Sequence, residues 1–497
     1  MKAHARFALL ALSLVTSAGC GGNSNSAMPG PTPGRTFTPG PVNAVRVSSD
    51  PFSNAGNQHA TEVEPQIVSS GLTLVAAFQQ GRNFNAGSSD IGFATSSDGG
   101  MTWTAGSIPG TTPWSPSAGP YDSVSDPSVA YDAKHAVWLI ASLPIFFSNA
   151  STPAALISRS LDGINWNLPV PVAPAQPSND KDWVTCDDTP SSTFYGHCYV
   201  EWDDPLNSGL IHMSTSADGG QTWSAPANTA NNADGIGGQP LVQPNGTVIV
   251  PINDNTQSNM LSFRSLDGGA TWSAAMPFAA ISDHLVAGGM RTSPLPSGAI
   301  DAAGNVYLAW QDCRFRTGCS ANDIVISTTS NGVSWSAPAR VPIDATTSGV
   351  DHFIPGLGID PATMGSGAHL GLMYYYYPNT ACPSGCQLFA GFVGSTDGGT
   401  TWTAPVTLAG PMSLGWLAQT SQGAMVGDYI ATAFSASQPV SVFAIANTKT
   451  AVFDEGMYVP KPGVISARAT TRHSSAGERP IPGVRSDHGP RAGPPIR

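Results

Sequence analysis

Residues 265–272 read SLDGGATW, which combines two hydroxyls, an acid, two glycines and a tryptophan in eight positions. The pattern recurs in full as SSDGGMTW (96–103), SADGGQTW (216–223) and STDGGTTW (395–402), and in shorter form as SLDGINW (160–166) and TSNGVSW (329–335). A motif that returns roughly every 50 to 65 residues predicts a repeat architecture. Its acid positions are Asp98, Asp162, Asp218, Asp267, Asn331 and Asp397.

The residue types of this motif predict a structural turn rather than a reactive site. A short acid can accept hydrogen bonds from nearby backbone N–H groups, and glycine adopts positive φ at little steric cost. The tryptophan provides a large apolar surface that can pack against a neighbouring sheet. We therefore expect each copy to fasten one unit of the repeat to the next.

Between the motifs, short β-branched and aromatic runs alternate with Gly, Pro, Asn and Asp, a pattern typical of strands and turns. The spacing fits one antiparallel four-stranded sheet per repeat, so we expect an all-β protein with a β-propeller fold. Seven candidate first strands favour seven blades over the alternative of six, and the strand AVRVSS (44–49) can complete the last blade from the N-terminal side. The candidate first strands begin near residues 64, 126, 182, 239, 297, 354 and 428.

The ends of the chain predict export. Residues 1–20 have a basic start, an apolar centre and a small-residue end, as in a signal peptide. The stretch SAGC resembles a bacterial lipoprotein cleavage box, which would place lipid on Cys20 and make residues 21–40 a flexible tether. Plain secretion without lipid is the alternative. Cell-surface or outer-membrane attachment in a bacterium would follow from the lipid.

Six further cysteines fall into three local pairs, and disulfides explain them better than a metal site because no His/Cys cluster has ligand spacing. We therefore expect no metal and no cofactor. The pairing is inferred from proximity, since six cysteines allow fifteen connectivities. The expected pairs are Cys186 with Cys198, Cys313 with Cys319, and Cys382 with Cys386.

Charge is scarce and unevenly distributed. Charged residues make up 11% of the 497 positions, and the formal net charge is −12. Residues 461–497 are basic and rich in Pro and Gly, so we expect a disordered tail. The folded part, residues 41–460, is therefore acidic, which argues against a nucleic acid partner. A monomer is expected.

The repeated S-x-D-x-G-x-T-W motif resembles the Asp-box, or BNR, repeat of the sialidase superfamily, and the resemblance spans roughly residues 41–460. It implies the propeller fold and a glycan partner. Sialidases of this kind hold the substrate carboxylate with three arginines, attack with a tyrosine paired to a glutamate, and use an aspartate as acid/base. The tyrosine suits an anionic substrate because that substrate repels a carboxylate nucleophile.

The chain matches this catalytic set only in part. Tyr429, in GDYIATAF, stands in a position similar to that of the family nucleophile, and Asp90 is the candidate acid/base. The first-strand arginine is replaced by Glu64, and Gln239 stands where the glutamate of the pair is expected. The strand ending at Asp254 lacks a second arginine.

Charged residues at the strand ends form the candidate site. Carboxylates at first-strand starts and second-strand ends meet at one mouth of a propeller, where they can act as acid/base groups, bind a cation or cap strands. Arginines expected on the same face can form an anion clamp or ordinary surface salt bridges. Besides Tyr429 and Asp90, the candidate catalytic groups are Glu64 and Asp428; the candidate substrate-binding groups are Arg82, Asp126, Asp182, Gln239, Asp254, Arg291, Asp312 and Arg314.

Two functions follow as hypotheses. The first is an exported glycoside hydrolase of sialidase-like type that acts on extracellular glycans. The second is a non-catalytic propeller that binds glycans or proteins at the cell surface. An enzyme requires two carboxyl groups, or a tyrosine and a carboxyl, about 5 to 9 Å apart in a pocket, whereas a binding module requires only a shallow surface.

Overall fold

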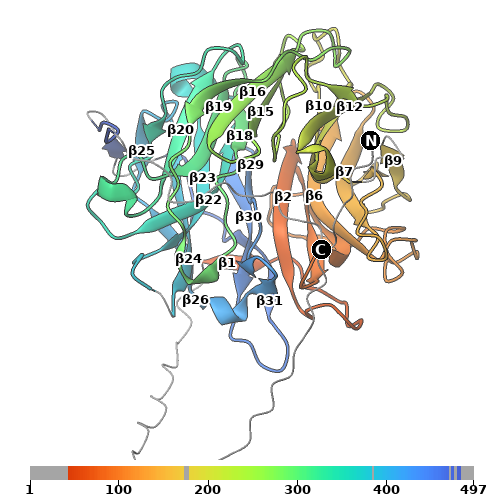
Figure 1. Cartoon of the computed structure of the whole chain (residues 1–497), viewed down its shortest axis with the longest axis horizontal. Helices are drawn as coiled ribbons and strands as arrows, with labels where there is room; N and C mark the ends of the chain where they lie inside the picture. Colours follow the sequence, from red (N-terminus) through yellow and green to blue (C-terminus); the bar gives the residue numbers. More distant parts are fainter. Residues whose placement is uncertain (1–42, 173–177, 383–384, 469–471, 475–477, 483–497) are drawn as a thin grey trace, which may run out of the picture. The chain divides into compact units, whose positions relative to one another are not determined.

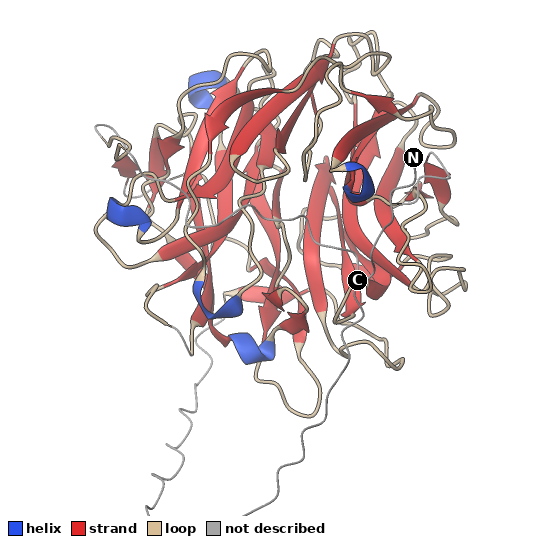
Figure 2. Ribbon diagram, viewed as in Figure 1, coloured by secondary structure: helices blue, strands red, loops and turns tan. Residues whose placement is uncertain are grey.

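The structure is a computed structural model that describes residues 43–172, 178–382, 385–468, 472–474 and 478–482. The predicted signal peptide, the tether and Cys20 lie outside these residues. Strands and loops make up nearly all of the described chain (Figure 2). Its helical elements are short 3-10 turns: η1 (Pro205–Asn207), η2 (Ala287–Gly289), η3 (Thr317–Cys319), η4 (Gly365–Gly367) and η5 (Leu414–Trp416).

Antiparallel four-stranded sheets dominate the described residues, as the repeat spacing predicts. An eight-stranded sheet divides at one residue pair, Ser88 with Val124, into two groups of four strands. The first group is β2 (Glu62–Ser70), β3 (Thr73–Arg82), β4 (Ser88–Ser96) and β5 (Thr104–Ser107); the second is β6 (Ser123–Asp132), β7 (Val137–Ile145), β8 (Ala155–Ser160) and β9 (Val170–Val172).

Four further sheets follow in chain order, each with an antiparallel path from its first strand to its last. They are β10 (Asp180–Cys186), β11 (Cys198–Asp204), β12 (Leu210–Ser216) and β13 (Ala227–Asn228); β14 (Leu241–Val242), β15 (Val248–Asn253), β16 (Asn259–Ser265) and β17 (Met276–Ala280); β18 (Ser297–Ile300), β19 (Val306–Asp312), β20 (Asp323–Thr329) and β21 (Ala339–Arg340); and β22 (Asp351–Ile359), β23 (Leu370–Tyr377), β24 (Gln387–Ser395) and β26 (Val406–Ser413).

One four-stranded sheet joins the two ends of the folded chain. Its order is β1 (Ala44–Arg46), β31 (Glu455–Pro460), β30 (Gln438–Ala446) and β29 (Ala431–Ser435). The register pairs Val45 with Val459. The N-terminal run therefore supplies the strand that the C-terminal hairpins lack, as expected from the sequence.

Hydrogen bonds link first strands of successive sheets, and Figure 1 shows β2 and β6 side by side with β29 and β30 nearby. Gln66 accepts from Val129 N at 2.9 Å, and Ser128 accepts from Val184 N at 2.9 Å. Ser297 accepts from Leu357 N at 2.9 Å. The last link returns to the first sheet, because Ser69 on β2 donates to Phe434 O on β29 at 2.6 Å.

The Asp-box turns have the structure that their sequence predicts. In the first copy, Asp98 accepts hydrogen bonds from the N–H groups of Met101 and Thr102 at 3.0 and 2.9 Å, and from the Thr102 hydroxyl at 2.6 Å. Gly99 and Gly100 have φ of +75° and +90°, a region that disfavours any residue with a Cβ. The six turns thus satisfy their acid or amide locally.

The second Asp-box turn packs against the preceding sheet. The Gly163 carbonyl accepts a 2.6 Å hydrogen bond from Thr95 on β4, and a Cβ at Gly163 would meet Val75 on β3 at 2.7 Å. The tryptophan of the same turn, Trp166, lies 6.0 Å from the ring of Phe93 on β4. These contacts match the predicted role of the motif as a fastener between units.

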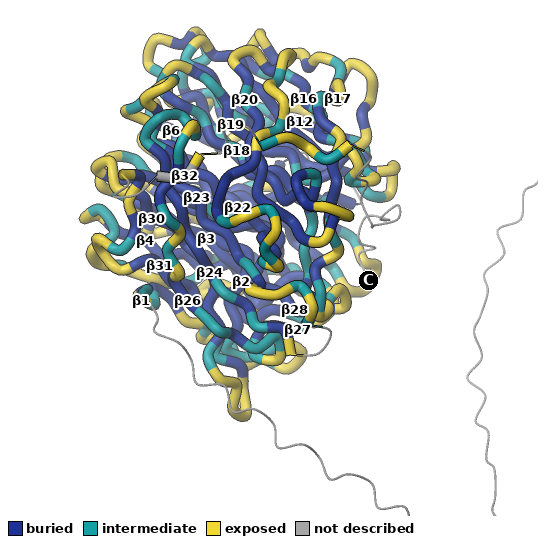
Figure 3. The backbone as a smooth tube through the Cα atoms, turned by 90° about the vertical axis from the view of Figure 1, so that its left-hand side faces the viewer, coloured by how far each residue is buried: buried dark blue, intermediate teal, exposed yellow. Residues whose placement is uncertain are grey.

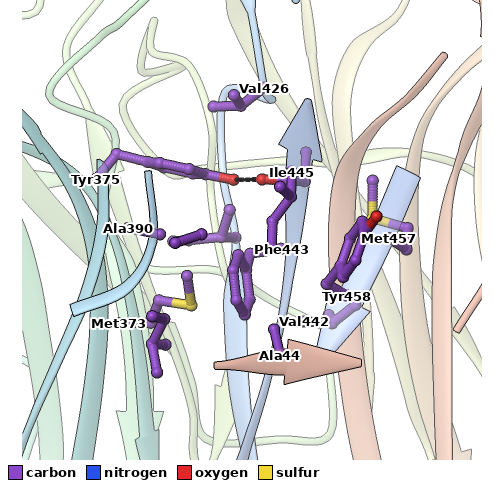
Figure 4. Close-up of a cluster of buried hydrophobic side chains, with 14 of the residues drawn as sticks. Ala44, Met373, Tyr375, Ala390, Val426, Val442, Phe443, Ile445, Met457 and Tyr458 are labelled. Atoms are coloured by element: carbon purple, nitrogen blue, oxygen red, sulfur yellow. Dashed lines mark hydrogen bonds between the residues drawn. The ribbon is translucent and has the colours of Figure 1, made fainter. Parts of the chain in front are cut away.

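The core is apolar and lies between the sheets, with exposure largely confined to loops (Figure 3). Figure 4 shows the part where β30 and β31 pack beside Tyr375 and Met373 of β23. The Tyr375 hydroxyl donates to Ala444 O at 2.7 Å, so this buried ring keeps its one polar group satisfied.

The three disulfides join the cysteines that proximity predicts: Cys186–Cys198, Cys313–Cys319 and Cys382–Cys386. Part of the segment predicted as a disordered tail is ordered. Strand β32 (Arg472–Ser474) pairs with β25 (Thr401–Thr403), and Glu478 lies 3.2 Å from the Arg340 guanidinium. The remaining pair of strands is β27 (Ala418–Thr420) with β28 (Gly423–Met425).

A membrane-spanning helix would have to be long and apolar, and none of the helices in the described residues meets both conditions.

Candidate functional site

Irregularities in first strands build the site. The pairing of β2 with β3, of β6 with β7, and of β10 with β11 shifts register near the strand start, as at a β-bulge. The residues at these shifts, Glu64, Asp126 and Lys181, have φ of +59°, +49° and +52°. Non-glycine residues rarely adopt such φ values, and a bulge re-aims the side chain it carries. The same kind of β-bulge thus re-aims a charged side chain in each of three successive four-strand groups.

Lys181 lies at the centre of these charges. Its Nζ is 3.5 Å from Glu64 Oε1 and 3.6 Å from Asp126 Oδ1, and it donates a hydrogen bond to Asp428. Burial lowers the pKa of Lys181, but the carboxylates of Asp126, Asp428 and Glu64 outweigh it and raise that pKa well above its ordinary value. The buried ammonium therefore stays charged and holds three carboxyl groups together. We call Glu64, Asp126, Lys181 and Asp428 the central cluster.

Arg291 holds Asp428 from the other side. Its Nε lies 2.7 Å from Asp428 Oδ1, its Nη2 bonds the other carboxylate oxygen, and its N–H donates to Ala424 O at 2.8 Å. Burial raises the pKa of Asp428, but Arg291 and Lys181 lower it by more, so this carboxylate remains ionised. Glu64 differs, because burial and the carboxylates of Asp126 and Asp428 raise its pKa to about 8 against the opposing effect of Lys181.

Arg82, at the end of β3, is buried, with 2% of its surface exposed. Its Nη1 donates to Asn83 O at 2.9 Å and to Gly87 O, and its Nε contacts the sulfur of Met425 at 3.4 Å. Among the ion pairs formed by the described residues, none involves Arg82. Burial and the nearby charge of Arg291 lower the pKa of Arg82 to about 10. The guanidinium groups of Arg82 and Arg291 thus lie close together. Among the carboxylates of the described residues, only that of Asp428 pairs with either group, and it pairs with Arg291.

A pocket of about 60 Å³ opens beside these groups, and its lining comes mainly from the first three sheets, with Arg291 and Gln422 added from later in the chain. Asp126 and Asp180 line it and share a side-chain hydrogen bond. Burial and the charge of Asp126 raise the pKa of Asp180 to about 7, whereas Lys181 and Arg291 keep the pKa of Asp126 below its ordinary value despite burial. Of the two carboxyl groups, that of Asp180 can therefore hold a proton near neutral pH. The charged lining residues are Arg82, Asp126, Asp180, Lys181 and Arg291.

Tyr429 lies beside the central cluster, but its hydroxyl donates to Pro127 O at 2.8 Å. Burial raises the pKa of Tyr429 well above its ordinary value, and Glu64 adds to that rise. A backbone carbonyl cannot take up the hydroxyl proton, so this arrangement does not activate the oxygen. Glu64, the carboxyl that would serve as its base, is fully buried and accepts a hydrogen bond from Gln79.

A second group of acids lies deeper. Both oxygens of Asp182 and both of Glu201 are buried without a side-chain hydrogen-bond partner, and burial raises the pKa of each well above its ordinary value. Asp203 is buried with them, and its pKa shifts in the same direction for the same reason. Asp182 also borders a narrow pocket with Tyr429 and Gln239.

Of the other predicted site residues, Gln239 lines the narrow pocket that Lys181 also borders, whereas Asp254, Asp312, Arg314 and Asp90 make their contacts elsewhere. Gln239 accepts from Gly298 N at 2.8 Å and links β14 to β18. Asp254 closes a loop by accepting from Ser258 N at 2.7 Å.

Asp312 and Arg314 pair with each other at 2.6 Å, so this arginine is already neutralised by a residue two positions away. Asp90 is buried on β4, where it accepts from the Thr111 hydroxyl at 2.5 Å, and burial raises its pKa to about 7.

Two groups of side chains among the described residues have the spacing of metal ligands. In one, Asp132 lies near Cys186 and Cys198, which are consumed in a disulfide. In the other, Asp323 and Asp344 lie near His352, but both carboxylates pair with Arg316. Neither group offers a free set of donors.

Sequence reasoning missed Lys181 and Asp180. Lys181 is one of three lysines between residues 41 and 460, and it stands among acids at the start of a predicted first strand. That signal was available. The register shift after Asp180, which turns the two neighbouring side chains into the site, has no comparable local signature.

Comparison with known families supports the Asp-box resemblance. Residues 199–358 match the family model of the BNR repeat-like domain. The predicted BNR-repeat resemblance is thereby confirmed over these residues. A search of curated protein sequences found no match to this chain.

Several solved structures are similar at low sequence identity. A protein of unknown function from Dyadobacter fermentans is 16% identical, with 71% of this chain and 99% of that chain covered and a TM-score of 0.45. An ulvan lyase solved with bound saccharide is 12% identical, with coverage of 88% and 100% and a TM-score of 0.47. The sialidase of Trypanosoma rangeli is 14% identical, with coverage of 84% and 58% and a TM-score of 0.44.

Proposed function

We propose that the folded chain is a seven-bladed β-propeller that acts on or binds glycans containing an acidic sugar. The blade count rests on seven groups of four strands, one of them completed by β1, and on hydrogen bonds that join several pairs of successive first strands, including β29 with β2. The six-bladed alternative leaves the sheet of β1, β29, β30 and β31 unassigned.

The observation that carries the glycan proposal is the pairing of Arg82 with Arg291 at the pocket beside Asp126 and Asp180. A buried guanidinium without a carboxylate partner, next to a second guanidinium, favours an anionic ligand between them. The carboxylate of an acidic sugar fits this chemistry, and its ring hydroxyls suit the polar lining of the pocket. The same residue types follow from the sialidase resemblance, although only two arginines meet here.

For the reaction, we propose hydrolysis of a glycosidic bond with Asp180 as the proton donor. Its pKa of about 7 allows it to hold a proton at neutral pH and to release it to the leaving oxygen. Asp126 stays ionised beside it and helps to pass a proton from the attacking water back to Asp180. Lys181 is a positioning residue, because it acts through Asp126 and Asp428. Tyr429 keeps its proposed role as nucleophile only if its hydroxyl leaves Pro127 O when substrate binds.

A specific observation favours the alternative of a non-catalytic glycan-binding propeller. The Tyr429 hydroxyl donates to a backbone carbonyl, and Glu64 is fully buried and accepts a hydrogen bond from Gln79. The hydrogen-bonded pair Asp126–Asp180 is also closer than the separation that two carboxyls of a glycosidase keep. Such a pocket can bind an acidic sugar without cleaving it.

One experiment separates the two functions. The full chain is assayed against aryl glycosides of sialic acid, glucuronic acid and galactose, and binding of the free acidic sugars is measured by calorimetry. A hydrolase releases aryl alcohol from an acidic glycoside, and Asp180→Asn lowers kcat about 100-fold or more. Asp234→Asn, an exposed acid, is the matched control. Binding without turnover, weakened by Arg82→Gln, identifies the binding protein. Equal affinity for galactose and both acids would refute the acidic-sugar proposal.

Export remains a proposal for residues 1–20, as does lipid attachment at Cys20. The three disulfides support it, because such bonds persist in oxidising compartments outside the cytosol. Labelling with a radioactive fatty acid, compared between the natural chain and Cys20→Ser, tests the anchor. A monomer is likewise proposed.

A further inference from the structure

A groove lined by aromatic side chains lies next to the pocket. Its volume is about 530 Å³, and it shares Asn85, Ala86 and Ile145 with the lining of the pocket. Three of its side chains are large, apolar and about half exposed: Phe84 at 52%, Trp114 at 45% and Phe147 at 54%. We call these three residues and their surroundings the aromatic groove.

The aromatic groove is built from loops of the first two sheets. Phe84 lies in the loop from β3 to β4, Trp114 in the loop from β5 to β6, and Phe147 in the loop from β7 to β8. Each loop is tied down by hydrogen bonds. Asp122 accepts from Phe147 N at 2.8 Å, and the Thr112 hydroxyl, which accepts from Trp114 N at 3.3 Å, donates to Ser89 O. The backbone that carries Trp114 and Phe147 is therefore held in place before any ligand arrives.

Exposed rings held in a concave site need an explanation, because most large aromatic side chains are buried in a core or an interface. Amide groups accompany the rings, since Asn54, Asn83 and Asn85 line the same groove. A pyranose ring matches this combination: its C–H face packs on aromatic surface, and its hydroxyls bond to amides at the edge.

The charges of the two hollows differ. The pocket is lined by three cations, Arg82, Lys181 and Arg291, and two acids, Asp126 and Asp180, whereas the residues lining the aromatic groove include no lysine or arginine and one acid, Asp122. An anionic sugar is therefore favoured in the pocket and disfavoured in the groove. A neutral sugar has no such penalty in the groove.

We propose that the aromatic groove binds a neutral pyranose unit that adjoins the acidic sugar in the same glycan chain. The statement that the neutral unit adjoins an acidic sugar rests on the proposed function, because that function places the acidic sugar in the pocket. It extends that function by assigning the substrate class: an oligosaccharide or polysaccharide with acidic and neutral units side by side. The lining residues shared by the two hollows provide the continuity that such a chain needs.

The test uses the full chain and three neutral probes, lactose, cellotetraose and xylotetraose, in ligand-observed NMR titrations. At least one probe is expected to bind, and Trp114→Ala or Phe147→Ala is expected to weaken it about tenfold, the effect of losing one stacked ring. Trp114→Phe keeps a ring and should retain most of the affinity. Leu161→Ala removes an apolar side chain that is even more exposed, at 78%, from an Asp-box turn and is the control.

A further variant separates this inference from the proposed function. Asp180→Asn alters the pocket and leaves the groove intact, so binding of the neutral probe should not change. If no acidic glycoside is bound or cleaved but neutral probes bind through Trp114, the proposed function fails and the groove is a sugar site on its own. If no neutral probe binds, or if both alanine variants bind as the natural chain does, the aromatic groove is not a sugar site and the inference is wrong.

Discussion

The carboxyl groups of the Asp-box turns and those of the central cluster belong to the same residue types, but their partners come from different parts of the chain. Their pKa values also differ in the direction of the shift, as Asp98 and Glu64 show. Asp98 is exposed and accepts its hydrogen bonds from residues no more than four positions away, which lowers its pKa to about 2. Glu64 is buried, receives one of its hydrogen bonds from Asp428 N, and has a pKa raised to about 8. The turn carboxylates are thus satisfied by their own segment, and the central ones only by the complete fold.

The largest expected effect tests the dependence of the central cluster on one cation. In Lys181→Met, the carboxyl groups of Glu64, Asp126 and Asp428 lose the buried ammonium that they share. Breaking a buried ion pair on one side costs about 3–5 kcal/mol, so the free energy of unfolding should fall by this amount in urea titrations. Lys134→Met, at an exposed lysine, should change little. A Lys181→Met protein as stable as the natural chain would mean that Arg291 alone holds the cluster.

The second prediction concerns pH, where the two regions should respond in opposite directions. The raised pKa values of Glu64 and Asp180 mean that the folded protein keeps protons that the unfolded chain loses between about pH 4 and pH 8. Stability should therefore fall as pH rises through this window, by up to about 1.4 kcal/mol per pH unit for each group. The depressed pKa of Asp98 contributes stability that is present above pH 4 and lost as pH falls toward 2.

Unfolding in urea at pH 5, 6, 7 and 8 measures this slope, and Glu64→Gln should flatten it because the amide does not titrate. An unchanged slope in Glu64→Gln would show that Glu64 is ionised in the folded state.

The smallest expected effect tests the locality of an Asp-box turn. Asp218→Ala removes the acceptor of hydrogen bonds from Gln221 N, Thr222 N and the Thr222 hydroxyl, and should cost about 1–2 kcal/mol. Asp218→Asn should cost less, because Asn331 in its own turn still accepts from Val333 N and Ser334 N. The difference is measured by thermal unfolding. Equal losses in the two variants would show that charge, rather than hydrogen bonding, makes the turn.

These contrasts explain how much the sequence reveals. The Asp-box turns, the four-strand units and the three disulfides are all local, and the residues that form them lie close together in the chain. The meeting of Glu64, Asp126 and Asp428 was also predictable in outline, because each stands at the start of a first strand. Strand position is enough to place a residue at a common mouth.

The partners of these groups were not predictable in the same way. For Arg314 the sequence left an anion clamp and an ordinary salt bridge as alternatives, and it pairs with Asp312, two residues before it. Lys181 enters the central cluster because a register shift in β10 turns it inward, and its neighbour Asp180 faces the pocket for the same reason. Such shifts depend on the packing of neighbouring sheets, which single strands do not encode.

The sheet that contains β1 has a consequence for the order in which the protein folds. Val45 and Val459 are neighbours in that sheet, although they emerge from the ribosome at opposite ends of synthesis. Contacts of such long sequence separation are slow to form, because a large part of the chain must be ordered before they stabilise anything. Until the last hairpin is made, the edges of β2 and β22 that face β29 stay open to other chains. Nascent chains should therefore be most prone to aggregate just before residue 460 emerges from the ribosome.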